Sequence, residues 1–218
     1  MENGDGTMRD VPMTKEEKLA RFKRLNETSK KGETVFAGSS LMEMFPIERF
    51  IREEGLNAIV YNRGVGGFVT EELLENIDTC ILDLKPSRLF INIGTNDLSD
   101  PARTVPQIMA NYGQILERVR AALPKIEITL MAYYPINYEA ATEEMKPCLA
   151  IRTNEKLRQA NRAAVALAAE HEARFIDLNA PLTDDKGNLK AEYTIEGMHI
   201  NEQGYRAVYP LLRAYILE

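Results

Sequence analysis

Short apolar runs recur along this chain, and each run is followed by polar or glycine-rich residues. Such runs are too short for helices and are typical of strands that are buried on both faces of a sheet. We predict strands of this kind at residues 33–38, 57–61 and 88–93, and two further strands at residues 126–132 and 174–178.

Between these runs, apolar residues recur at three- and four-residue spacings, which indicates helices that bury one face. Thr14 with Glu17 forms a capping-box sequence before the first of them, and Asn201 is a suitable N-cap for the last. A shorter helical segment begins near Leu41. The longer helices are predicted at residues 15–29, 70–84, 105–123, 149–172 and 202–217.

The regular alternation of strand and helix predicts an α/β fold: a three-layer α/β/α sandwich around a mostly parallel sheet of about five strands. Residues 1–13 are expected to form a flexible tail. Residues 14–218 are expected to form a single domain, because no composition shift marks a linker. Active sites in such sheets lie at the carboxyl ends of the strands, so the residues after each strand are the candidates.

Charge and composition narrow the function class. The formal net charge is −6 with no basic block, which argues against a nucleic-acid-binding or anionic-membrane surface. No signal-like or membrane-spanning apolar stretch occurs, so a cytoplasmic location is expected. Cys80 and Cys148 have no CxxC or histidine-rich companions, which favours two reduced thiols over a disulfide or a zinc site.

Three strand ends carry residues suited to acyl chemistry. Ser39 and Ser40 follow the first strand, and either could be a nucleophile or a helix N-cap. The sequence "NRGVGG" after the second strand could present backbone N–H groups to an anion, or could be a simple turn. It is not a dinucleotide fingerprint, because Val69 stands where the third glycine belongs. Asn96 follows the third strand and could donate its amide to a substrate oxygen, whereas Asp97 beside it is expected to bond locally.

The stretch "GMHINEQGY" before the last helix holds His199, one of two histidines in the chain. Glu196 precedes it by three residues, so a turn can bring the carboxylate to Nδ1 and leave Nε2 free for a hydroxyl. A surface histidine is the alternative interpretation for this position taken alone.

Serine, glycine, asparagine and histidine occur in this order at strand ends and before the last helix. In this respect residues 34–205 resemble the SGNH (GDSL-like) hydrolases, which have a flavodoxin-like α/β fold. The resemblance implies that Ser40 is the nucleophile and His199 the general base. It also implies an oxyanion hole formed by Ser40, Gly67 and Asn96.

Two positions depart from the family pattern. Ser39 stands where the family has the aspartate of Gly-Asp-Ser, a position that shapes the turn. Glu196 stands where the family has an aspartate, and we expect it to be the third member of a catalytic triad. The alternatives are a dyad in which a backbone carbonyl orients His199, and a weakened enzyme.

The resemblance implies a serine esterase that works through an acyl-enzyme and requires no metal and no cofactor. The expected partner is a small-molecule ester carrying a short acyl group such as acetyl, and a homo-oligomer is possible. The competing hypothesis is a non-hydrolytic module that binds carbohydrate or ester ligands.

Substrate contacts are predicted from residues beside the catalytic positions. Phe68, Leu98 and Met198 flank these positions, and Tyr134 lies in segment 133–147, which is long enough to form a lid or wall. Ordinary packing is the alternative role for these side chains.

Overall fold

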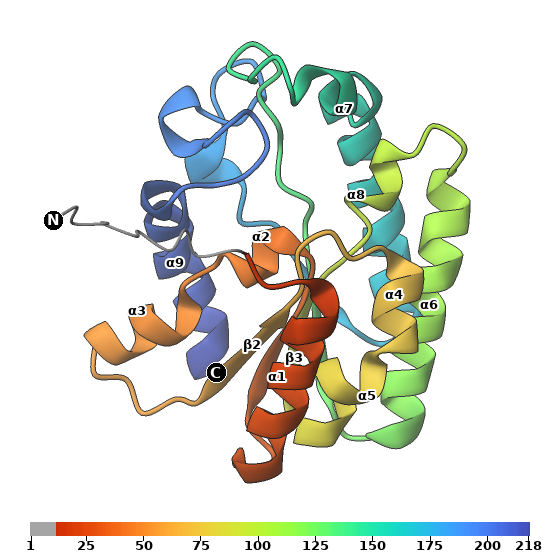
Figure 1. Ribbon diagram of the computed structural model, residues 1–218, viewed down its shortest axis with the longest axis vertical. Coiled ribbons are helices and arrows are strands. Elements are labelled where there is room, and N and C mark those ends of the chain that lie inside the picture. The colour runs from red at the N-terminus through yellow and green to blue at the C-terminus, as the bar shows by residue number, and fades with distance from the viewer. Residues whose placement is uncertain (1–11) are drawn as a thin grey trace, which may run out of the picture.

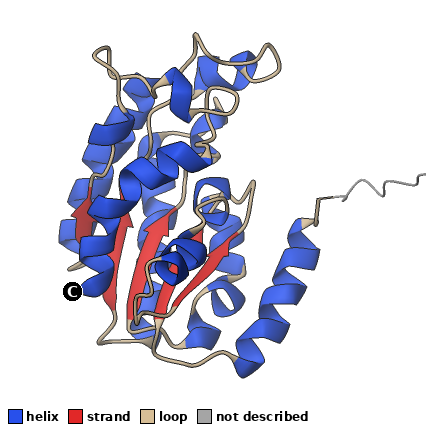
Figure 2. Cartoon of the chain, turned by 90° about the vertical axis from the view of Figure 1, so that its left-hand side faces the viewer, coloured by secondary structure: helices blue, strands red, loops and turns tan. Residues whose placement is uncertain are grey.

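The computed structural model describes residues 12–218, and its five strands form one parallel sheet in the order β2-β1-β3-β4-β5. Figure 2 shows the strand arrows pointing in the same direction, with helices on both sides of the sheet. The predicted α/β/α sandwich is therefore confirmed. The strands are β1 (Thr34–Gly38), β2 (Val60–Gly64), β3 (Arg88–Asn92), β4 (Glu127–Met131) and β5 (Arg174–Ile176).

Two helical layers cover the sheet (Figure 1). Strand residues alternate between the layers, because successive side chains point to opposite faces: Val35 and Ala37 join one apolar cluster, and Phe36 joins the other. The first cluster lies under α1 (Lys15–Thr28), α4 (Thr70–Glu75), α5 (Ile77–Cys80), α6 (Val105–Ala122), α7 (Lys146–Ile151) and α8 (Asn154–Glu170). The second lies under α2 (Ser40–Glu43), α3 (Ile47–Glu53) and α9 (Glu202–Leu217).

Both predicted helix caps are present. The Thr14 hydroxyl accepts from the Glu17 backbone N–H and the Glu17 carboxylate accepts from the Thr14 N–H, which completes the capping box of α1. The Asn201 side chain accepts from the Gly204 N–H at the start of α9.

Several predicted elements differ from the structure. The helix predicted over residues 70–84 is divided into α4, α5 and a short 3₁₀ turn, because Asn76 and Ile81 leave the helical conformation. The helix predicted over residues 149–172 is interrupted at Arg152, and Thr153 caps a new helix, α8. The prediction also lacked α3, which buries the apolar residues at its start and middle.

The second strand begins three residues later than the pattern suggested, at Val60 rather than Asn57. It lies at the edge of the sheet, where only one neighbour pairs with it, and Tyr61 and Asn62 are partly exposed. The prediction of burial on both faces is therefore wrong for this strand. A polar edge strand does not show the continuous apolar run that the sequence criterion requires.

The sheet order places the strand ends that matter side by side. Strand β1 pairs with β2 on one side and with β3 on the other, and Gly38 lies opposite both Gly64 and Asn92. The segments after these three strands therefore meet at one edge. Within residues 12–218, no helix is long and apolar enough to cross a membrane. The tail expected at residues 1–13 falls almost entirely outside the described residues, and the domain limits stay a prediction.

Candidate active site

A tight turn from β1 into α2 presents the candidate nucleophile. A Cβ atom on Gly38 would lie 2.0 Å from the Asn92 carbonyl oxygen and 2.7 Å from the Met42 side chain, so only glycine fits this position. Ser40 follows as the first residue of α2. Ser39 occupies the N-cap position, but its side chain makes no capping bond and its buried hydroxyl has no partner in the described structure. The two serines therefore do not serve as side-chain caps.

The structure brings Ser40, His199 and Glu196 into one line of hydrogen bonds. His199 Nε2 lies 3.0 Å from Ser40 Oγ, and His199 Nδ1 lies 2.6 Å from Glu196 Oε1. Both distances are within hydrogen-bond range. The arrangement lets the imidazole take a proton from the serine while the carboxylate faces the opposite ring nitrogen.

A compact turn accommodates the glutamate in place of the shorter aspartate. The Glu196 Oε1 atom accepts both His199 Nδ1 and, at 3.1 Å, the His199 backbone N–H. The turn is held by the Ile195 N–H, which donates to the His199 carbonyl, and by the Gly197 N–H, which donates to the Thr194 hydroxyl. The additional methylene is thus taken up locally, with the carboxylate fixed by two donors.

The glycine loop, residues 65–68, supplies the second candidate donor. The Phe68 N–H donates to the Val65 carbonyl at 3.2 Å, which closes a tight turn, and Gly67 has φ +79°. This combination is typical of a type II turn, in which the central residue with positive φ favours glycine. Within residues 12–218, the Gly67 N–H has no acceptor. The Ser40 N–H is also free of an intrahelical bond, because it belongs to the first helical residue.

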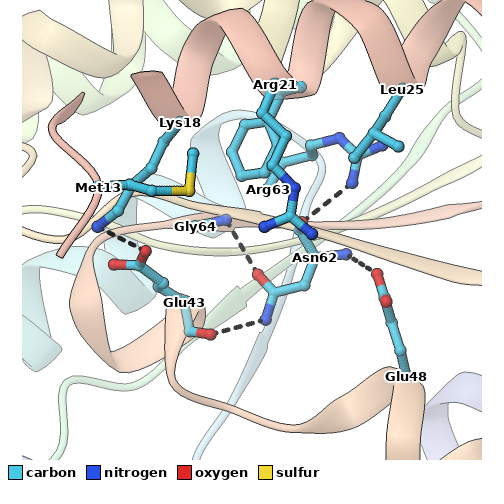
Figure 3. A pocket seen from close by; sticks show the side chains of 10 residues that line it. Met13, Lys18, Arg21, Leu25, Glu43, Glu48, Asn62, Arg63 and Gly64 are labelled. Atoms are coloured by element: carbon cyan, nitrogen blue, oxygen red, sulfur yellow. Dashed lines mark hydrogen bonds and ion pairs between the residues drawn. The ribbon is translucent and has the colours of Figure 1, made fainter. Parts of the chain in front are cut away.

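Charged side chains bond to the glycine loop on both sides of the Gly67 N–H. Glu43, one turn after the candidate nucleophile, accepts the Gly66 N–H at 2.7 Å and forms an ion pair of 2.6 Å with Lys18 of α1. Figure 3 shows this ion pair between the N-terminal helix and α2. Lys15 donates to the Gly67 carbonyl at 3.1 Å. The two peptide groups flanking the Gly67 N–H are therefore fixed by side chains.

Asn62 ties the edge strand β2 to the nucleophile helix. Its Nδ2 donates to the Met42 carbonyl at 2.6 Å, and its Oδ1 accepts the Gly64 N–H at 3.0 Å. Asn62 lines a cavity of about 220 Å³ between α1 and β2. Figure 3 shows the side chains that line this cavity. Neither Ser40 nor His199 lines this cavity. Two of its lining side chains, Asn62 and Lys18, instead bond to α2.

The third candidate donor, Asn96, is oriented by two bonds. Its Nδ2 donates to the Phe68 carbonyl at 2.9 Å, which joins it to the glycine loop, and its Oδ1 accepts Arg152 Nη2 at 2.8 Å. Since Nδ2 carries two hydrogens, one remains for another acceptor. Within residues 12–218, no such acceptor is bonded to it.

Asp97, the neighbouring carboxylate, bonds to residues outside the line of Ser40, His199 and Glu196. It is fully buried and accepts the Thr70 N–H and hydroxyl, the latter at 2.6 Å, together with Arg103 at 2.9 Å. These bonds tie the third strand end to the start of α4. Asp97 thus has a structural role, although its partners are more distant in sequence than the local turn expected for it.

A sequence model of the GDSL-like Lipase/Acylhydrolase family matches residues 47–207. The chain belongs to this family. The expected resemblance to SGNH hydrolases is therefore confirmed, and family membership supports hydrolysis of an ester.

Individual relatives agree with this assignment. The chain is 24% identical over 190 residues to platelet-activating factor acetylhydrolase IB subunit alpha1 of Rattus norvegicus, covering 86% of this chain and 76% of that protein. Among solved structures, a Streptococcus pneumonia protein described as a "putative platelet activating factor" is 31% identical, with a TM-score of 0.82 over 93% of this chain and 92% of that one. An acetyl-xylooligosaccharide esterase from Geobacillus Stearmophilus, 18% identical, shares the fold with a TM-score of 0.65 over 86% and 95% of the two chains.

In this acylhydrolase, the four side chains expected to contact substrate are mostly enclosed. Leu98 is 0% exposed, Phe68 1%, Tyr134 3% and Met198 8%. Phe68, Leu98 and Met198 belong to the first apolar cluster, and Tyr134 belongs to the second. Their burial agrees with the alternative packing role, and contact with substrate stays a prediction.

Sequence reasoning missed the residues that position the acylhydrolase site. Glu43 lies three residues after Ser40 on one helix, so its proximity could have been inferred once α2 was assigned. Lys15 and Arg152 act on segments more than fifty residues away, and no local pattern indicates such partners.

The two cysteines are the remaining residues considered for metal or redox chemistry. Both cysteines are free, with Cys80 buried and Cys148 partly exposed. Burial raises the pKa of the Cys80 thiol to about 12. In residues 12–218, no group of three histidine, cysteine or acidic side chains is arranged to hold a metal ion.

Proposed function

We propose that this acylhydrolase is a serine esterase that removes small acyl groups, such as acetyl, from a small-molecule alcohol. The observation that carries the proposal is the continuous bonding from Ser40 through His199 to Glu196, at 3.0 and 2.6 Å. The relative named an acetylhydrolase supports a short acyl group.

The first half-reaction forms an acyl-enzyme. His199 Nε2 accepts the Ser40 proton as Oγ bonds to the ester carbonyl carbon. The carbonyl oxygen becomes an oxyanion, and the Ser40 and Gly67 N–H groups and the free Asn96 Nδ2 hydrogen are the donors that would bind it. The tetrahedral intermediate then breaks its bond to the alcohol oxygen, which leaves with the proton from His199.

The second half-reaction uses water. His199 takes a proton from water as the water oxygen attacks the carbonyl carbon of the acyl-enzyme. The bond to Ser40 Oγ then breaks, the acid is released, and Ser40 regains a proton from His199. Glu196 fixes the imidazole through Nδ1 and stabilises its protonated form in both halves. Because these steps use only side chains, backbone N–H groups and water, the proposal requires no metal or cofactor.

The competing hypothesis was a binding module with a relaxed catalytic site. Its distinguishing feature would be a separation of Ser40, His199 and Glu196, whereas the observed contacts are within bonding distance. The geometry therefore favours the hydrolase.

The test is hydrolysis of p-nitrophenyl acetate, butyrate and octanoate by the wild type and by Ser40→Ala, with labelling by a fluorophosphonate probe. We expect turnover fastest on acetate, and loss of both turnover and labelling in Ser40→Ala. A wild-type protein that neither turns over nor labels would contradict the proposal and would favour the binding module. Fastest turnover on octanoate would contradict the small acyl group alone.

A further inference from the structure

A buried arginine without a carboxylate partner lies behind the candidate oxyanion hole. Arg152 is 4% exposed. Its Nε donates to Ser99 Oγ at 2.7 Å and its Nη2 to Asn96 Oδ1 at 2.8 Å, while Nη1 contacts Met198 Sδ. None of the carboxylates in residues 12–218 forms an ion pair with it. A buried cation is costly unless it is paired, so this arrangement requires an explanation.

The acidic and thiol groups nearest to Arg152 do not neutralise it. Asp97 contributes a favourable field, but its oxygens are bonded to Thr70 and Arg103. The Cys148 Sγ atom lies 3.2 Å from Ser99 Oγ, and no ion pair joins it to Arg152. Burial is the main effect on Arg152 and lowers the pKa of its guanidinium. A guanidinium nevertheless remains charged at neutral pH.

The local backbone directs this charge to the site. Arg152 ends α7 in a non-helical conformation, with φ −86° and ψ 71°, and Thr153 then begins α8. The sequence pattern of residues 149–172 predicts one continuous helix. In the structure the helix is instead interrupted at Arg152, the residue whose side chain bonds to Asn96.

The contact with Asn96 has two consequences for that amide. Because Oδ1 is held by a guanidinium and one Nδ2 hydrogen by the Phe68 carbonyl, the amide cannot exchange its oxygen and nitrogen positions without losing both bonds. A cation at the amide oxygen also polarises the group, which makes its remaining N–H a stronger donor.

We propose that Arg152 is a positioning residue of the oxyanion hole. It fixes the Asn96 amide with its free N–H toward the reacting carbonyl, and its charge acts through this amide, whose polarised N–H binds the oxyanion more strongly than the neutral ester. This inference rests on the proposed function. It predicts an effect on kcat rather than on KM, because the charge that it stabilises is present only in the transition state and the tetrahedral intermediate.

The test is a double-mutant cycle on p-nitrophenyl acetate. Removal of one oxyanion donor costs about 100- to 1,000-fold in kcat, so Asn96→Ala should fall in that range. A residue that acts through Asn96 cannot cost more than this, and we expect Arg152→Gln to lower kcat about 10- to 100-fold with little change in KM. In the Asn96→Ala background, Arg152→Gln should cause no further loss. Arg152→Lys, which keeps the charge, should retain more activity than Arg152→Gln.

Arg63 provides a matched control. It is 3% exposed, and its Nε and Nη2 donate to the Asn26 amide oxygen at 3.0 and 2.9 Å without a carboxylate ion pair in the described structure. Figure 3 shows Arg63 beside α1. Both Arg63→Gln and Arg152→Gln should lower the thermal midpoint, because each removes a buried hydrogen-bonded group. Arg63→Gln should leave kcat unchanged at temperatures where the protein is folded.

Three results would overturn the inference. The first is a kcat of Arg152→Gln equal to that of the wild type. The second is a double variant whose loss of kcat is the product of the two single losses. The third is an Arg152→Lys variant with a kcat as low as that of Arg152→Gln. If Arg152→Gln does not fold, the same cycle with Arg152→Lys decides by whether its loss disappears in the Asn96→Ala background. Absence of Ser40-dependent turnover in the wild type would instead remove the proposed function and this inference with it.

Discussion

Neutralising Glu196 while keeping its shape tests the triad directly. In Glu196→Gln, the side-chain oxygen can still accept the His199 Nδ1 and backbone N–H groups that Glu196 Oε1 accepts at 2.6 and 3.1 Å. The substitution therefore removes mainly the negative charge that stabilises the protonated imidazole in the transition state.

The expected loss follows from Coulomb attraction. Two unit charges about 4 Å apart interact by about 4 kcal/mol at an effective dielectric constant near 20. The side chains of His199 and Glu196 are 25% and 16% exposed, so solvent screens part of this attraction. A remaining loss of about 2–4 kcal/mol corresponds to a kcat lower by about 30- to 1,000-fold.

The assay is steady-state hydrolysis of p-nitrophenyl acetate, with KM expected to stay close to the wild-type value because the charge acts after binding. Glu192→Gln is the control, since Glu192 is an exposed glutamate of the same segment outside the triad, and its kcat should not change. A loss of less than about threefold in Glu196→Gln, beside an inactive Ser40→Ala, would refute the reasoning. Another group would then orient His199, as in the dyad alternative.

Three further predictions concern the loop, the thiols and alkaline stability. Lys15→Met removes the donor to the Gly67 carbonyl and should lower kcat about 3- to 10-fold. Lys23 is an exposed residue of the same helix, and Lys23→Met should leave kcat unchanged. Equal kcat values for Lys15→Met and the wild type in steady-state assays would contradict this prediction. In titration with a thiol reagent, Cys148 should react in the native protein and Cys80 only after unfolding, since burial raises the Cys80 pKa to about 12; rapid reaction of both native thiols would contradict it. Burial and the neighbouring Glu54 raise the pKa of Tyr209 to about 12, so the folded state keeps a proton that the unfolded chain releases near pH 10. The urea midpoint should therefore fall as the pH rises from about 10 to 12, and a constant midpoint would exclude this effect.

Local sequence signals predicted most of the fold. Strands β1, β3 and β4 are buried almost throughout because they are central, and most of their residues are apolar. Helices α6 and α9 have clear one-sided apolar patterns. The prediction was wrong where long-range contacts override local pattern.

The edge strand shows the first kind of long-range effect. Asn62 and Arg63 lie within β2 although neither favours a buried strand. Asn62 bonds to carbonyl groups of α2, and Arg63 bonds to Asn26 on α1. These partners are 20 and 37 residues away, so no local pattern could reveal that the strand includes them.

In the candidate site, too, local motifs predicted the reacting residues but not the contacts that position them. Motif order placed Ser40, Gly67 and Asn96 at strand ends and His199 before the last helix, and the sheet brings the three strand ends together because parallel strands share one carboxyl edge. The distances that make the arrangement chemically competent depend on other residues. The hydrogen-bond line through Glu196, for example, requires the turn closed by Thr194.

Each candidate oxyanion donor is fixed by a different partner that is not itself expected to contact the substrate. The helix that carries Ser40 is bonded to Asn62, the glycine loop is held by Glu43 and Lys15, and Asn96 is held by Arg152. Donors that are fixed before the substrate binds need no reorganisation when charge develops, which is the main source of their catalytic effect. The short motifs therefore specify which groups react. The four partners Asn62, Glu43, Lys15 and Arg152 determine how accurately those groups are placed, so substitution of any of these four should change kcat while the reacting groups are intact.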